Sequence, residues 1–96
     1  MDEQQRQHLR GRYASARQRY LMIRKPTEFG RMRAEGELNE HLELIGKEAA
    51  DYYETLMTQM LEMAENMTNP REKADYLSRM PFAADELTLH DVVYEE

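Results

Sequence analysis

Apolar residues between positions 37 and 67 recur at steps of three and four along the chain without a break. This spacing puts them on one face of an α-helix, and charged residues fill most of the opposite face. The pattern predicts one long acidic amphipathic helix over residues 37–67, roughly 45 Å long at about 1.5 Å per residue. The apolar positions are Leu38, Leu42, Ile45, Ala49, Tyr52, Tyr53, Leu56, Met60, Met63 and Met67.

A second helical pattern covers residues 1–25, where a narrower apolar stripe is bordered by arginines. We expect this helix to end at Lys25, because the residue before a proline is disfavoured in the α conformation. Gly11 lies inside the segment and weakens the helix by about 1 kcal/mol. The stripe consists of Leu9, Tyr13, Ala16, Tyr20 and Ile23.

The segment 27–35 predicts a short helix that Gly36 closes, because glycine readily adopts the left-handed conformation after a helix end. It contains few apolar residues, so we expect it to connect the two larger helices and not to form a layer of its own. The pattern therefore predicts an all-α protein. We expect residues 1–96 to form a single domain, a small helical bundle or helical hairpin assembly built around one long central helix.

The C-terminal third carries a clear helix start signal. Asn69 followed by Pro70 is the preferred order of an N-cap and a first helical residue. We expect one helix over residues 70–80, ending before Pro81, and a second over residues 82–94.

Composition restricts the class of protein further. The 96 residues are 41% hydrophobic and 33% charged, which is too apolar for a disordered tail. No stretch approaches the 18 or so uncharged residues that a membrane span needs, and the charged N-terminus is unlike a secretory signal. The absence of cysteine excludes disulfides and thiol chemistry. We expect a cytoplasmic protein that does not contact the membrane.

The net charge of −6 is unevenly distributed along the chain. Residues 1–33 hold nine of the 13 basic residues and only three acidic ones, so the net negative charge comes entirely from residues 34–96. Such asymmetry is typical of a nucleic-acid-binding half, or of two halves that attract each other.

The sequence offers little support for catalysis. The only histidines are His8, His41 and His90, and none lies in a spacing known from metal sites. The chain also lacks a glycine-rich phosphate loop and any recognisable nucleophile with a base. We therefore expect no enzymatic activity, no cofactor and no bound metal.

Two surfaces remain as candidates for a macromolecular partner. The long helix carries a row of carboxylates that could imitate a phosphate backbone and bind the basic channel of a nucleic-acid-processing protein. That row is Glu40, Glu43, Asp51, Glu54, Glu62 and Glu65.

The alternative is direct nucleic-acid binding through a stripe of the N-terminal helix. Arginine pairs with phosphate and tyrosine stacks on bases, so this composition suits nucleic acid. In a second interpretation the tyrosines face the core and the arginines pair with acids of the long helix. The stripe is Arg6, Arg10, Tyr13, Arg17, Tyr20 and Arg24.

Several motifs resemble the small transposon-encoded proteins of the TnpV type. The resemblance covers about residues 19–94 and starts with Arg19-Tyr20-Leu21, Pro26 and Phe29. Gly46 departs from the family pattern, which usually has an acidic residue there, and the stretch between Met80 and Ala84 is shorter. The other matching residues are Gly36 to Ile45, Ala49, Leu56, Gln59-Met60, Thr68, Arg79-Met80, Ala84 to Leu87 and Val92 to Tyr94.

The resemblance implies a helical protein of a bacterial mobile element, and it supplies no catalytic residues. Mobile elements carry small acidic proteins to block host defence nucleases, as anti-CRISPR proteins do, or to assist recombination and regulation. Our leading hypothesis is therefore a non-enzymatic inhibitor or modulator that mimics nucleic acid. The alternative is a DNA-binding accessory or regulatory factor. A homo-oligomer fits either hypothesis, because a single chain has a thin core.

Overall fold

The computed structural model describes residues 1–96 as helices joined by short connections. No residue forms a β-strand, which confirms the predicted all-α class and its long central helix. The elements are α1 (Glu3–Arg24), α2 (Pro26–Ala34), α3 (Leu38–Glu65), α4 (Pro70–Thr88) and a π-helical turn, η1 (Leu89–Val93).

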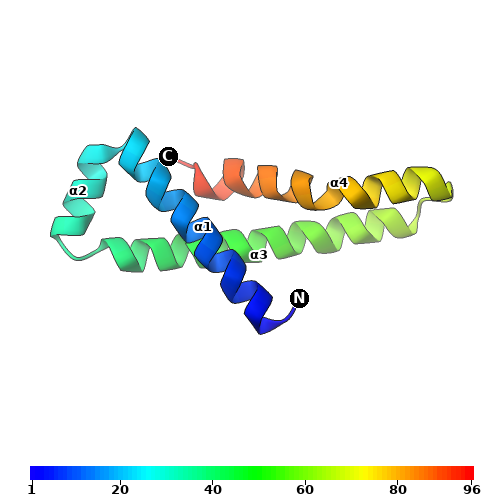
Figure 1. Ribbon diagram of the computed structural model, residues 1–96, viewed down its shortest axis with the longest axis horizontal. Coiled ribbons are helices and arrows are strands. Elements are labelled where there is room, and N and C mark those ends of the chain that lie inside the picture. Colours follow the sequence, from blue (N-terminus) through cyan, green and yellow to red (C-terminus); the bar gives the residue numbers. More distant parts are fainter.

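The helices form a flat assembly around an antiparallel hairpin. Helices α3 and α4 run side by side in opposite directions, and α1 crosses α3 obliquely (Figure 1). Helix α2 turns the corner between α1 and α3, and η1 brings the C-terminal end of the chain back to α1. The Cα positions extend over 55 × 26 × 14 Å, so the molecule is little more than one helix layer with α1 laid across it.

The core lies where α1 crosses the hairpin. Tyr13 is completely buried there and packs with Ala16 of α1, Ala49 of α3 and Val93 of η1. A second small cluster joins α1, α2 and α3 through Leu21, Met32 and Leu42. Most of the buried apolar side chains belong to these two clusters, so the α1 crossing holds the molecule together.

Gly46 is the point of closest approach between α1 and α3. A Cβ atom at this position would lie 2.5 Å from the main-chain oxygen of Arg10 and 3.3 Å from the Cβ of Ala14. Only a glycine therefore allows the backbones to approach so closely. Gly46, which departs from the pattern of the family that the sequence resembles, is thus the residue at which α1 packs most closely on α3.

Side-chain caps fix the helix ends. The Asp2 carboxylate accepts from the Gln5 main-chain N–H at 2.8 Å, and the Gln5 side chain accepts from the Asp2 N–H at 3.1 Å. This capping box starts α1 at Glu3, well before the weakening Gly11. At α4, the Asn69 side chain accepts from the main-chain N–H groups of residues 71 and 72, as the sequence predicts.

Gly36 closes α2 as predicted. Its φ of 73° is the only positive φ in the chain. The main-chain N–H of Glu37 donates to the Met32 carbonyl at 2.8 Å, and that of Gly36 donates to the Arg33 carbonyl at 3.3 Å. These two bonds form a Schellman motif, which turns the chain sharply into α3.

The predicted break at Pro81 is wrong. The structure has one helix, α4, through Pro81, followed directly by η1, instead of separate helices over residues 70–80 and 82–94. Pro81 removes one hydrogen bond to the carbonyl of Leu77, but both residues lie on the exposed side, where water can replace it. Burial of Ala84, Thr88 and Val93 beyond the proline keeps the helix continuous.

Two parts of the predicted apolar surface remain exposed. Ile23, which the sequence assigns to the buried stripe of α1, is 75% exposed. The buried face of the helix passes instead through Arg17 and Leu21. The distal arm, which we define as residues 55–82 of the hairpin, extends beyond the cover of α1. Only Ala64 and Met80 are buried there. None of the helices combines the length and apolar character needed to cross a membrane.

We predict that Gly46→Ala destabilises the protein although alanine favours helix formation. The new methyl group must separate α1 from α3, and such overpacking costs about 1–3 kcal/mol, which exceeds the gain in helix propensity of about 1 kcal/mol. Gly11→Ala is the matched control, because a Cβ there meets nothing within 4 Å. Thermal denaturation followed by circular dichroism should give a lower Tm for the first variant and a higher Tm for the second. Equal increases would contradict the close approach.

Candidate functional site

The arginines at the start of α1 pair with acidic residues of the hairpin. The Arg6 guanidinium donates to both carboxylate oxygens of Glu54 on α3, at 3.0 and 3.2 Å. This hydrogen-bonded pair raises the pKa of Arg6 and lowers that of Glu54. Arg10 forms its one ion pair with Glu3 of its own helix, at 3.7 Å. The ion pairing that the sequence left as an alternative is therefore present for Arg6.

Asp85 of α4 binds two neighbouring residues of α1. Its carboxylate accepts from the Tyr13 hydroxyl at 2.8 Å and lies 2.9 Å from the Arg12 guanidinium. Burial and the bond to this carboxylate raise the pKa of Tyr13. Tyr13 is thus a core residue whose one polar atom is satisfied inside the protein, and it is not available to stack on a base.

Arg17 is buried without a carboxylate partner. Its Nη1 donates to the main-chain carbonyls of Val93 and Glu95, at 2.8 and 2.7 Å. The Val93 carbonyl ends the α4–η1 helix and the Glu95 carbonyl lies just beyond it. The helix dipole favours a positive charge at this end. Burial lowers the pKa of the guanidinium. An arginine at this position can still remain charged, because its guanidinium titrates only at very high pH.

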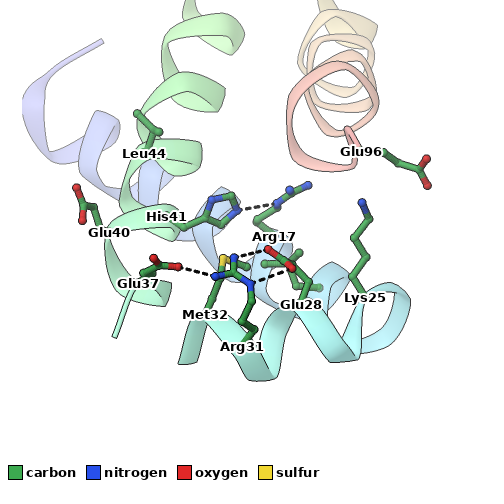
Figure 2. Close-up of a pocket in the computed structure, with 11 residues that line it drawn as sticks. Arg17, Lys25, Glu28, Arg31, Met32, Glu37, Glu40, His41, Leu44 and Glu96 are labelled. Atoms are coloured by element: carbon green, nitrogen blue, oxygen red, sulfur yellow. Dashed lines mark hydrogen bonds and ion pairs between the residues drawn. The ribbon is translucent and has the colours of Figure 1, made fainter. Parts of the chain in front are cut away.

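His41 completes what we call the Arg17 clamp, namely Arg17 with its acceptors on Val93, Glu95 and His41. The Arg17 Nε donates to the His41 Nε2 at 3.2 Å (Figure 2). Burial and the nearby Arg17 charge lower the pKa of His41. Because the His41 Nε2 atom must accept this hydrogen bond, the clamp requires a neutral imidazole. The clamp joins α1 to α3 and to the C-terminal residues after α4.

The clamp lies at the edge of an open groove of about 610 Å³ between α1, α2 and α3. Arg31 occupies its α2 side, where it donates to Glu28 and Glu37 (Figure 2). It also donates to Glu35. The bond from Arg31 lowers the pKa of Glu28. The lining includes no serine, threonine or cysteine that could act as a nucleophile. Glu28, Arg31 and Glu37 of the lining are held in ion pairs, whereas Lys25, Glu40 and Glu96 form none.

A second groove lies on the other side of the C-terminal residues. The rings of Tyr20 and Tyr94 stack there with centroids 5.5 Å apart, and the Arg17 guanidinium lies 5.2 Å from the Tyr20 centroid. We call this the aromatic groove. It is lined by Ala16, Arg19, Tyr20, Ile23, Arg24, Tyr94 and Glu96.

The acidic face of α3, defined as the six carboxylates predicted from the sequence, points away from the core. All six side chains are exposed except Glu54, which is half-buried against Arg6. The other five form no ion pair within the chain. The carboxylates also recur in pairs every eleven residues, which is close to three helix turns, so the row drifts by only about 20° per repeat. The pairs are Glu40 with Glu43, Asp51 with Glu54, and Glu62 with Glu65.

The structure thus brings the acidic row together and disperses the basic stripe. Tyr13 and Arg17 are buried, Arg6 is paired, and only Tyr20 and Arg24 share a surface, the aromatic groove. Sequence reasoning missed Arg19 and Tyr94 in that groove and His41 in the clamp. The spacing of α1 gave no signal for them, because the groove and the clamp form only where α3 and the C-terminal residues meet α1.

One further polar cluster lies between α3 and η1. No group of three or more histidine, aspartate or glutamate side chains is placed to hold a metal ion. Tyr52 donates to Asp91, which also contacts the exposed His90 ring at 2.8 Å. The bonds from His90 and Tyr52 lower the pKa of Asp91, and the carboxylate raises the pKa of Tyr52. This chain of groups ends in solvent.

The family model for the transposon-encoded protein TnpV matches residues 1–93 of the chain. The chain belongs to the TnpV family. The match covers the N-terminal helix as well, so it reaches further than the motifs from Arg19 onward. No curated protein and no solved structure shows a significant match. Family membership thus identifies a transposon-encoded protein, and its molecular role has to be argued from the surfaces described above.

We predict that Arg17→Ala is far more damaging than Arg24→Ala. Removal of Arg17 leaves the Val93 and Glu95 carbonyls and the His41 nitrogen without their donor, at a cost of about 2–4 kcal/mol. Arg24 is exposed and forms no ion pair, so its removal should change the free energy of unfolding by less than about 0.5 kcal/mol. Urea denaturation of the two variants measures both values. Similar costs would show that the clamp is not important for stability.

We also predict a loss of stability that depends on His41 as pH falls below about 6.5. The fold lowers the pKa of His41 below its ordinary value of 6.5, so the unfolded chain takes up this proton first as pH falls. The contribution of His41 is therefore complete above that value and decreases as pH falls through it. His41→Gln keeps an acceptor for Arg17 and should flatten the pH dependence of the Tm, whereas His8→Gln should keep it. An unchanged slope in His41→Gln would contradict the role of the clamp.

Proposed function

We propose that this transposon-encoded protein is non-enzymatic and acts in the bacterial cytoplasm by binding a nucleic-acid-processing protein. In this proposal the acidic face of α3 occupies the basic surface on which the partner normally holds nucleic acid. A host defence nuclease of the CRISPR type is the partner class to test first. The protein would then act as an inhibitor or modulator that mimics nucleic acid.

The observation that carries the proposal is the set of uncommitted carboxylates on a straight helix. Glu40, Glu43, Asp51, Glu62 and Glu65 are exposed and have no cation of their own chain within ion-pair distance. Their row spans roughly 37 Å along α3. A basic channel would gain counter-charges from this row without first having to break internal pairs.

The distribution of basic residues supports the same proposal. Nucleic acid binding through α1 would need its arginines at the surface, but Arg17 is buried and Arg6 is paired with Glu54. The exposed remainder has to act next to an acidic hairpin, which repels phosphate. Direct DNA binding as an accessory factor is therefore the less favoured hypothesis.

Charge reversal on the acidic face tests the proposal. We expect Glu43→Lys with Asp51→Lys to weaken inhibition of DNA cleavage by a CRISPR nuclease at least about tenfold, because both charges face the partner. The matched control is Glu72→Lys with Glu86→Lys on α4. It changes the net charge equally at two exposed carboxylates without ion pairs, and it should retain inhibition.

Two results would contradict the proposal. One is equal activity of the acidic-face variant and its control against a nuclease that the wild-type protein inhibits. The other is a mobility shift of duplex DNA by the wild-type protein whose affinity falls steeply with salt, with a log–log slope of about −0.9 per phosphate contact. That second result would favour the DNA-binding alternative, and loss of the shift in Arg24→Glu would place it on α1.

A further inference from the structure

The aromatic groove has the composition of a protein-binding surface. Large hydrophobic side chains of its lining are exposed: Ile23 is 75% exposed and Tyr94 46% exposed. The groove has a volume of about 690 Å³ and opens to solvent between α1 and the C-terminal residues. Tyrosine and arginine around an apolar centre are the residue types that contribute most to binding at protein interfaces.

The two arginines of this groove are uncommitted. Ion pairs within the chain involve Arg6, Arg10, Arg12, Arg31 and Arg79, but neither Arg19 nor Arg24. Both are exposed. Glu96 is the one acidic side chain in the lining. The groove thus combines exposed apolar side chains with two unpaired arginines, and its complement is an apolar side chain next to carboxylates.

The chain itself carries such a complement on the first turns of α3. Leu44 is 54% exposed although it lies in the longest amphipathic helix. Glu40 and Glu48 lie one helix turn before and after it, so their side chains flank Leu44 on the same face. Lys47 is the only basic residue within this stretch of α3. We call Leu44 with Glu40 and Glu48 the acidic knob.

We propose that the aromatic groove of one copy receives the acidic knob of a second copy of this chain. Groove and knob are opposite in charge and both have an apolar centre, so the contact buries Leu44 against Ile23 and the tyrosines. Both surfaces lie near the C-terminal residues, because Glu96 lines the aromatic groove and also the open groove whose lining includes Glu40 and Leu44. A two-fold arrangement would use both surfaces of each copy at once.

The thin fold gives a reason for such pairing. Only 14 of 96 residues are buried, and large apolar side chains remain exposed along the molecule, Ile23 and Leu44 among them. A second copy would cover Ile23 and Leu44 together, with ion pairs at the edge of the contact. The contact uses Glu40, which also belongs to the acidic face, and it leaves Asp51, Glu62 and Glu65 of that face uncovered. The variant Glu43→Lys with Asp51→Lys changes neither the groove nor the knob, so failure of the pairing and failure of the proposed function can be distinguished.

Light scattering after size-exclusion chromatography tests the pairing through a charge exchange. We expect the wild-type protein to have twice the mass of one 11.5 kDa chain at low salt and to dissociate as salt increases. Arg19→Glu with Arg24→Glu makes both surfaces acidic, and Glu40→Arg with Glu48→Arg makes both basic. Each double variant alone should be monomeric, whereas an equimolar mixture of the two should restore the dimer.

Matched controls change the same charges elsewhere. Arg33→Glu with Arg71→Glu, and Glu62→Arg with Glu65→Arg, alter exposed residues without ion pairs outside both surfaces, and both should remain dimeric. Circular dichroism of every variant verifies that the helices are intact. A wild-type protein that is monomeric at about 100 µM, far above the Kd of a specific dimer, would overturn the proposal. So would double variants that stay dimeric, or a mixture that stays monomeric.

Discussion

The close approach of α1 and α3 at Gly46 is the constraint on which the other contacts depend. With no side chain between the two backbones, Tyr13 can reach the alanine surface of α3 and the end of η1. The same crossing places Arg6 beside Glu54 and brings Arg12 and Tyr13 to Asp85 of α4. A wider separation would remove these contacts together, because they share one rigid helix.

The hydrogen bonds of a buried arginine join helices that share only a small apolar core. Arg17 ties α1 to the C-terminal end of the α4–η1 helix and to the start of α3, using main-chain carbonyls and a neutral histidine in place of a carboxylate. Other basic residues of α1 are also used inside the molecule. The charge asymmetry of the sequence therefore serves the packing of α1 on the hairpin, and the carboxylates of α3 are left facing solvent.

Local signals in the sequence were sufficient for most of the fold. The three-and-four spacing predicted α1 and α3 to within a few residues, and Asn69 and Gly36 predicted where α4 begins and α2 ends. These features depend only on neighbouring residues. The continuation of α4 through Pro81 could not be predicted in this way, because it depends on burial of residues beyond the proline against other helices.

Of the two candidate surfaces, the acidic row could be predicted from local sequence and the basic stripe could not. An exposed acidic row follows from the periodicity of a single helix, and the structure has it. Whether residues of the basic stripe are exposed or buried depends on which side of α1 packs against the hairpin. Arg17 lies on that side and is buried. A pattern that counts apolar residues assigns such an arginine to solvent, and it assigns Ile23 to the core. Tertiary packing reversed both assignments.

The unequal cover of the hairpin implies a gradient of local stability along α3. Its first half is held by α1, α2 and the C-terminal residues, whereas the distal arm has only α4 to pack against. Amide protons of the arm should exchange with solvent through openings of lower free energy than those at the Gly46 crossing. The carboxylates of Glu62 and Glu65 therefore stand on the part of the helix that opens most easily. A partner that binds there would have to order this end of α3, while the end near Glu40 is held rigid before any encounter.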